Sequence, residues 1–134
     1  MESSSADRTV SLTIPAKPDY VVLARLALSA VCRLAPLELE AAADLKLAIT
    51  EAASFMMGGD RRSTSREDGE APQMTFSFDL QDDAIVVYVK GEQAPTISEE
   101  ERELSRAIID ATADDCLIED GTMRLTKRLG LETP

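Results

Sequence analysis

The sequence predicts an α+β fold, in which one mixed, mostly antiparallel sheet packs against three helices on one of its faces. Two observations lead to this prediction. Some segments alternate apolar and polar residues with a period of two, whereas others repeat apolar residues at helical spacing. These segments follow one another in the order β-α-α-β-β-α-β-β, which is not the strict alternation of a parallel α/β protein. A chain of 134 residues with 44% hydrophobic content has enough apolar side chains for one core.

The first half of the chain predicts a strand followed by two helices. Residues 1–8 are polar and serine-rich and are expected to form a disordered tail, so that a single domain spans 9–130. Residues 9–15 alternate and end at a proline, which predicts a half-buried strand. A helix is expected over 20–35 and a second over 37–57. The first helix has an apolar stripe that we expect to face the core: Leu23, Leu26, Ala27, Ala30, Val31 and Leu34.

The middle of the chain predicts a hairpin after a polar loop. Residues 59–72 are nearly all polar or glycine and are expected to form a long mobile loop. Residues 74–80 alternate again, and residues 84–89 are continuously apolar, with a turn of three polar residues between them. Two adjacent strands with so short a connection are expected to pair as an antiparallel hairpin.

The last third of the chain predicts a helix followed by two short strands. Ser98 and Glu101 have the spacing of a capping box, so a helix is expected to begin there and to run to about residue 114. A short apolar segment at 116–118 and an expected strand at 122–129 flank a predicted turn at Asp120 and Gly121. The predicted core face of the helix consists of Leu104, Ala107, Ile108 and Ala111.

The charge balance excludes several classes of partner. The chain has 25 acidic and 14 basic residues, which gives a formal net charge of −11. Such a surface repels phosphate backbones and anionic lipids, so we expect neither nucleic-acid binding nor membrane binding. It would attract a basic protein, although acidity can also serve solubility alone. The chain has no histidine, which excludes histidine-based catalysis and histidine-ligated metal.

The two cysteines and the N-terminus predict a cytoplasmic protein. Cys32 and Cys116 are far apart in sequence and lie among apolar residues, which indicates buried free thiols in a reducing compartment. No signal-peptide pattern and no apolar run of membrane-spanning length is present.

Several stretches resemble, in order and at matching spacing, the RsbW/SpoIIAB-type anti-sigma factors. These are I-P-A-K-P-D-Y-V at 14–21, R-L-A-L-S at 25–29, D-L-K-L-A-I-T-E-A-A-S-F at 44–55, D-D at 114–115 and T-M-R-L-T-K at 122–127. The resemblance covers about residues 9–130. It implies a histidine-kinase-like ATPase fold of the GHKL type, and family members are serine-protein kinases that use ATP and Mg²⁺.

The resemblance also assigns positions of a nucleotide site. Glu51 matches the family's general base, whereas Phe55 replaces the asparagine that holds Mg²⁺. Val89 replaces the aspartate that binds adenine, and Gly91 is the retained residue of that glycine motif. At the second glycine motif, which wraps the phosphates, Glu103 and Ser105 replace family residues, and the ATP lid is expected to be deleted.

Three hypotheses follow. The first is a non-enzymatic anti-sigma factor that binds a sigma factor and a STAS-type anti-anti-sigma protein, with no metal and no nucleotide cofactor. Glu51 would then be a vestigial carboxylate, exposed or paired with a neighbour such as Lys46 or Arg106. The second is an active serine-protein kinase that uses ATP and Mg²⁺ to phosphorylate a STAS-domain antagonist, with Glu51 as base. The third is a fold repurposed for an unrelated partner. By resemblance, Arg25 is a candidate partner contact and a homodimer is expected.

Overall fold

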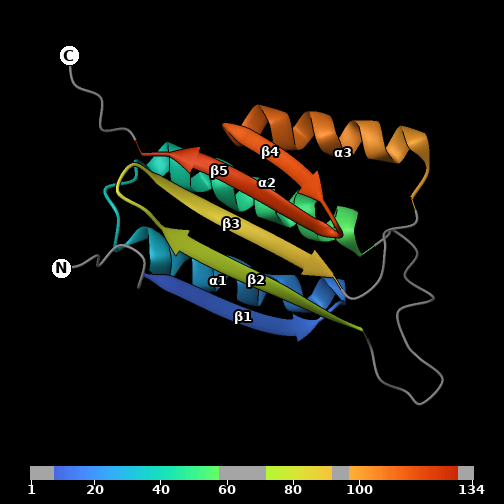
Figure 1. Ribbon diagram of the computed structural model, residues 1–134, viewed down its shortest axis with the longest axis horizontal. Helices are drawn as coiled ribbons and strands as arrows, with labels where there is room; N and C mark the ends of the chain where they lie inside the picture. The colour runs from blue at the N-terminus through green and yellow to red at the C-terminus, as the bar shows by residue number, and fades with distance from the viewer. Residues whose placement is uncertain (1–7, 58–71, 92–96, 130–134) are drawn as a thin grey trace.

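One antiparallel sheet and a layer of helices make up the computed structural model, which describes residues 8–57, 72–91 and 97–129. Within these ranges, five strands form a sheet in the order β1-β2-β3-β5-β4, with the helices on one face (Figure 1). All four strand pairings are antiparallel, so the sheet is simpler than the mixed sheet that the sequence predicted. The α+β, two-layer prediction is confirmed. The strands are β1 (Thr9–Pro15), β2 (Gln73–Leu80), β3 (Ala84–Gly91), β4 (Asp115–Glu119) and β5 (Thr122–Arg128).

The predicted element order is also confirmed. A short 3-10 turn, η2 (Pro18–Tyr20), leads into α1 (Val21–Cys32), which is followed by α2 (Leu39–Met56) and later by α3 (Glu99–Thr112). Both α1 and α3 pack against α2, and α2 lies between them (Figure 1). The expected N-terminal tail, apart from residue 8, and the expected loop, apart from residue 72, lie outside the described residues.

Local signals fix two of the element boundaries. At the start of α3, the Ser98 hydroxyl accepts a hydrogen bond from the Glu101 amide at 3.1 Å, and the Glu101 carboxylate accepts one from the Ser98 amide at 3.2 Å. This is the predicted capping box. Between β4 and β5, Asp120 and Gly121 both have positive φ, at 50° and 76°, as a tight two-residue hairpin turn requires.

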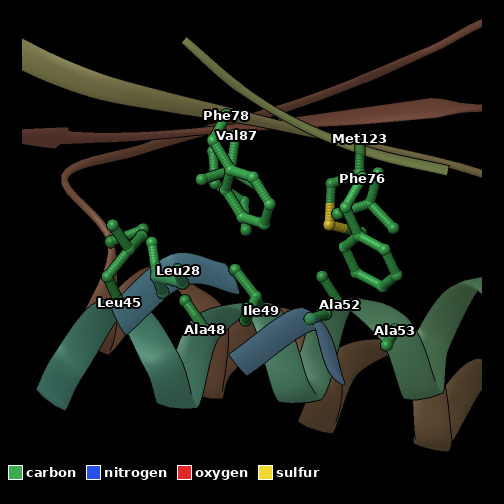
Figure 2. Close-up of a cluster of buried hydrophobic side chains, with 14 of the residues drawn as sticks. Leu28, Leu45, Ala48, Ile49, Ala52, Ala53, Phe76, Phe78, Val87 and Met123 are labelled. Atoms are coloured by element: carbon green, nitrogen blue, oxygen red, sulfur yellow. The ribbon is translucent and has the colours of Figure 1, made fainter. Parts of the chain in front are cut away.

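The core lies between the sheet and the inner side of the helices (Figure 2). From the sheet, Phe76 and Phe78 point toward α2, and both are fully buried. The facing turns of α2 carry alanines, among them Ala48 and Ala52, which leave room for the two rings. Because protein interiors are close-packed, this alternation of large and small side chains holds α2 at a defined distance from the sheet.

The opposite face of the sheet is polar along β1 and β2. Thr13 lies opposite Thr75 and Ser11 opposite Ser77 in the β1–β2 register, and the two hydroxyl pairs are 2.9 and 3.1 Å apart. Small hydroxyl side chains that hydrogen-bond across the strands satisfy one another without a covering layer. The helices therefore cover one face only, as predicted.

The predicted core faces of α1 and α3 are wrong. On α1 the buried residues are Val21, Ala24, Leu28 and Val31, so only Val31 of the predicted stripe is buried. On α3 they are Ser105, Ile109 and Thr112, while Leu104, Ala107 and Ala111 are exposed and Ile108 is half-buried. Nearly every residue of α1 is apolar, so periodicity could not distinguish its sides. On α3, a hydrogen bond from Ser105 turns a polar side inward, as described next.

Candidate functional site

Three of the positions that the resemblance assigned to the nucleotide site, Glu51, Phe55 and Ser105, meet at the junction between α2 and α3. The C-terminal half of α2 carries Glu51 and Phe55, and the first two turns of α3 carry Arg102 and Ser105. On each helix the two residues are three or four positions apart, so they lie on the same side. The two helices pack directly on each other, which brings the four side chains together.

The first contact across the junction is a hydrogen bond. The hydroxyl of Ser105 donates to Oε2 of Glu51 at 2.6 Å. Ser105 is only 8% exposed and Glu51 is half-buried, so water competes little for this bond. A hydrogen bond to a charged acceptor contributes about 1.5–3 kcal/mol. The partner of the Glu51 carboxylate is thus Ser105.

Arg106, which the sequence suggested as one possible partner of Glu51, has other contacts. Arg106 instead donates from Nε to Asp110 at 3.3 Å and from Nη2 to the backbone carbonyl of Cys116 at 3.1 Å. Its guanidinium therefore connects α3 to β4 and is turned away from α2. The sequence reasoning missed Ser105 as a partner because it treated this residue only as a replacement for a glycine.

The second contact across the junction joins a ring and a cation. Phe55 is 2% exposed and belongs to the hydrophobic core. The guanidinium carbon of Arg102 lies 5.6 Å from the centre of its ring, a cation–π distance. Arg102 is exposed, so its planar group covers the outer side of Phe55. This residue was not predicted, although its spacing of three from Ser105 places both on one side of α3.

A third set of contacts fastens the other end of α3. Lys127 of β5 donates to the backbone carbonyl of Thr112 at 3.2 Å. The same ammonium lies 3.7 Å from a carboxylate oxygen of Asp44 on α2 and 4.0 Å from one of Asp114. One largely buried lysine thus joins β5, α2 and the end of α3. Helix α3 is held at both ends.

The remaining predicted positions lie elsewhere. Val89 is fully buried on the core side of β3, in register with Phe76 and Met123. Gly91 is half-buried at the end of the same strand. Glu103 is exposed on α3, and Arg25 is half-buried on α1, on the other flank of α2. Neither Glu103 nor Arg25 is among the four residues of the junction.

These residues do not fit the contacts that ATP and Mg²⁺ require in the family. The ring of Phe55 offers no oxygen to a cation that needs oxygen ligands. Val89 has no acceptor for an adenine amino group and is enclosed by the core. Among the described residues, no group of three or more carboxylate or thiol side chains is placed to hold a metal ion. Ser105 further occupies Glu51 with a hydrogen bond.

A second feature is an apolar surface on the outer side of α1. It consists of Val22, Leu23, Leu26 and Ala30, all exposed, with Leu26 at 61%. We call it the α1 surface. Arg25 and Ser29 are the polar residues of this helix, and both are half-buried. A helix that is apolar on all sides is normally covered on all sides.

Comparison with known proteins supports the sequence resemblance. No protein-family profile matches the chain. The serine-protein kinase RsbW of Listeria innocua is 36% identical over 80 residues, which is 60% of this chain and 48% of that protein. RsbW of Oceanobacillus iheyensis is 30% identical over the same length. The chain spans about half the length of the curated relatives it matches.

A solved structure has the same fold. The crystal structure of the RsbU and RsbW domains of Rv1364c from Mycobacterium tuberculosis superposes with a TM-score of 0.67, over 90% of this chain and 32% of that chain. Its sequence identity is 17%, so this likeness concerns the fold alone. The likeness in sequence is thus to RsbW serine-protein kinases over part of their length, and the likeness in fold is to a structure that contains an RsbW domain.

In the described part of the chain, no helix is long and apolar enough to cross a membrane.

Proposed function

We propose that the chain is an anti-sigma factor-like regulator that binds a sigma factor and a STAS-type anti-anti-sigma protein without using a nucleotide. One observation carries this proposal: the α2–α3 junction is filled by the protein's own side chains. Ser105 holds the carboxylate of Glu51, and Arg102 covers Phe55. Under this proposal, a nucleotide that uses Glu51 must first displace the side chains of α3 that contact α2.

Moving α3 would have a substantial cost. It would break the bond between Ser105 and Glu51, the contact between Arg102 and Phe55, and the hydrogen bond of Lys127 at the far end of the helix. It would also expose the ring of Phe55 to water, which costs about 1.5–3 kcal/mol by itself. The opened site would still lack an oxygen ligand at position 55. The contacts therefore favour a role that does not depend on ATP.

The α1 surface supports the expected homodimer. Val22, Leu23 and Leu26 present aliphatic area without a carboxylate on the same helix, so two copies could meet there without carboxylates of α1 facing each other. A two-fold symmetric interface places the same patch on both partners, as a continuous apolar helix side allows. Arg25 borders this surface and is the residue that we propose as a specific partner contact.

The experiment that tests the proposal uses the purified chain and sigma factors from its source. Binding is measured by calorimetry in nucleotide-free buffer, before and after addition of Mg-ATP, and the STAS protein is then added as competitor. We expect binding that ATP does not change and that the STAS protein reverses, with no phosphoserine found by mass spectrometry. Sigma binding that requires Mg-ATP would contradict the proposal.

An active serine-protein kinase is the second candidate. The retention of Glu51 at the family's base position favours it, as does the 36% identity to proteins named serine-protein kinases. This reading requires α3 to move during each catalytic cycle. It predicts Mg²⁺-dependent phosphate transfer to the STAS protein that Glu51→Ala abolishes and Glu99→Ala, at an exposed carboxylate of α3, leaves intact.

A further inference from the structure

The outer side of α3 carries an apolar row that nothing in the described part of the chain covers. It consists of Leu104, Ala107, Ile108 and Ala111, and we call it the α3 surface. Leu104 is 64% exposed, the two alanines are exposed, and Ile108 is half-buried. These residues lie at the spacing of one helix side, next to the side that packs on α2. The helix thus has two packing sides, of which α2 and the sheet cover one.

The charge around this row is strongly negative. Residues 99–120, which include α3 and β4, contain nine carboxylates and two arginines, a formal charge of −7 out of −11 for the whole chain. Glu100, Glu103 and Asp110 are exposed on α3 beside the apolar row. Both arginines already have contacts, Arg102 with Phe55 and Arg106 with Asp110 and the Cys116 carbonyl.

This charge decides which occupant fits. A second copy would bring its own excess of carboxylates against the same surface, and like charges that face each other across an interface cost affinity. Nucleic acids and anionic membranes are repelled for the same reason. The α1 surface differs, because its helix contains Arg25 and no carboxylate. A covering partner on α3 must therefore supply both apolar side chains and positive charge.

We infer that the α3 surface docks a cationic amphipathic helix of a partner protein. The row of Leu104, Ile108 and Ala111 provides an apolar surface for the aliphatic side of that helix, and Lys or Arg side chains of the partner meet Glu100 and Glu103. The 14 residues of α3 span about 21 Å, which matches a partner helix of about four turns. The inference rests on the proposed function only in that the chain binds proteins.

The test uses a defined probe. An 18-residue peptide of Leu at helical spacing and Lys on both flanks, labelled with a fluorophore, is titrated with the protein at 0.15 M salt. A peptide of the same composition in scrambled order removes the amphipathic pattern, and a peptide with Glu in place of Lys reverses the charge. We expect the patterned cationic peptide to bind at least tenfold more tightly than either control peptide.

Matched variants locate the binding. We expect Leu104→Ser and Glu103→Lys each to weaken binding at least tenfold. Leu39→Ser, at a leucine that is 87% exposed at the start of α2, and Asp82→Lys, at the exposed β2–β3 turn, control for lost apolar area and added charge, and should change binding less than twofold. All four sites are exposed, so thermal melts should stay superimposable.

Three results would overturn the inference. The scrambled peptide could bind as tightly as the patterned one, Asp82→Lys could weaken binding as much as Glu103→Lys, or Leu104→Ser could change the oligomeric state and not peptide binding. The assay contains no sigma factor and no nucleotide. If sigma binding is present but peptide binding is not, the α3 inference alone fails; the reverse result contradicts the proposed function alone.

Discussion

The two flanks of α2 are used in opposite ways. Toward α3, side chains of α2 make contacts within the chain: Glu51 accepts a hydrogen bond from Ser105, and Phe55 lies under the guanidinium of Arg102. Toward α1, the facing side chains are also buried, but Val22 and Leu26 on the outer side of α1 are exposed. The groups that a nucleotide would need are already engaged, whereas the apolar area that a protein would need is free. This contrast is the basis of the proposed shift from catalysis to binding.

The largest effect is expected where the junction joins the core. Phe55→Asn restores the side chain that the family uses for Mg²⁺, but it removes a buried ring and leaves an amide among apolar neighbours. We expect a loss of about 3–5 kcal/mol in the free energy of unfolding, measured by urea denaturation. Ser54→Asn, at the exposed neighbouring position, should stay within about 0.5 kcal/mol of the parent. A stable Phe55→Asn variant that binds Mg-ATP would show that the site is only dormant.

On the other flank, a charge placed on the α1 surface should disrupt the dimer. Leu26→Asp puts two carboxylates against each other across a symmetric interface, and we expect the dimer dissociation constant to rise at least tenfold, or about 1.4 kcal/mol. Sedimentation velocity over a concentration series measures this change. Leu39→Asp, also highly exposed but outside the α1 surface, should leave the dimer intact. If the parent chain is monomeric at about 100 μM, the α1 surface does not mediate a homodimer.

A smaller effect is expected from the hydrogen bond itself. Ser105→Ala leaves the half-buried carboxylate of Glu51 without its partner, so we expect a loss of about 1–3 kcal/mol in the free energy of unfolding. In the background of Glu51→Ala, the same substitution should cost less, because the partner is already gone. A double-mutant cycle measures this coupling. A coupling energy of zero would mean that the bond does not help to hold α3 on α2.

The smallest effect concerns the thiols. Burial raises the pKa of Cys32 and of Cys116 above the ordinary value of 9.0. The positive charge of Lys46 lowers the pKa of Cys32, and that of Arg106 lowers the pKa of Cys116, but burial has the larger effect. Both should be protonated at pH 7 and react slowly with a thiol reagent. Since the folded pKa is the higher one, their contribution to stability is complete below pH 9 and is lost as the pH rises through the folded values.

Urea midpoints at pH 8 and pH 10, for the parent and for Cys32→Ala with Cys116→Ala, test the thiol prediction. The fall in stability between the two pH values should be smaller in the double variant. Rapid modification of either cysteine by a thiol reagent at pH 7 would contradict the prediction that both thiols are protonated.

The sequence predicted the elements better than their faces. Alternation located the strands, and the Ser98 capping box and the Asp120–Gly121 turn located two boundaries, because these signals depend on neighbouring residues. The faces of α1 and α3 were mispredicted for two physical reasons. An almost wholly apolar helix has no unique inner side, and the inward turn of Ser105 depends on Glu51, which is 54 residues away.

The same limit applies to the candidate site. By resemblance, the sequence identified Glu51 and Phe55 as positions of the site. It did not identify Arg102 or Lys127, whose roles arise from contacts with α2 across the fold. The substituted positions alone do not show how the junction between α2 and α3 is filled. The contacts of Ser105 with Glu51 and of Arg102 with Phe55 show it.

Calorimetric titration of the purified chain with ATP and ADP, with and without Mg²⁺, tests the central claim most directly. We predict no heat of binding at millimolar nucleotide, because α3 occupies the junction and position 55 has no oxygen ligand. Micromolar, Mg²⁺-dependent binding would contradict this prediction and would make the serine-protein kinase the leading candidate.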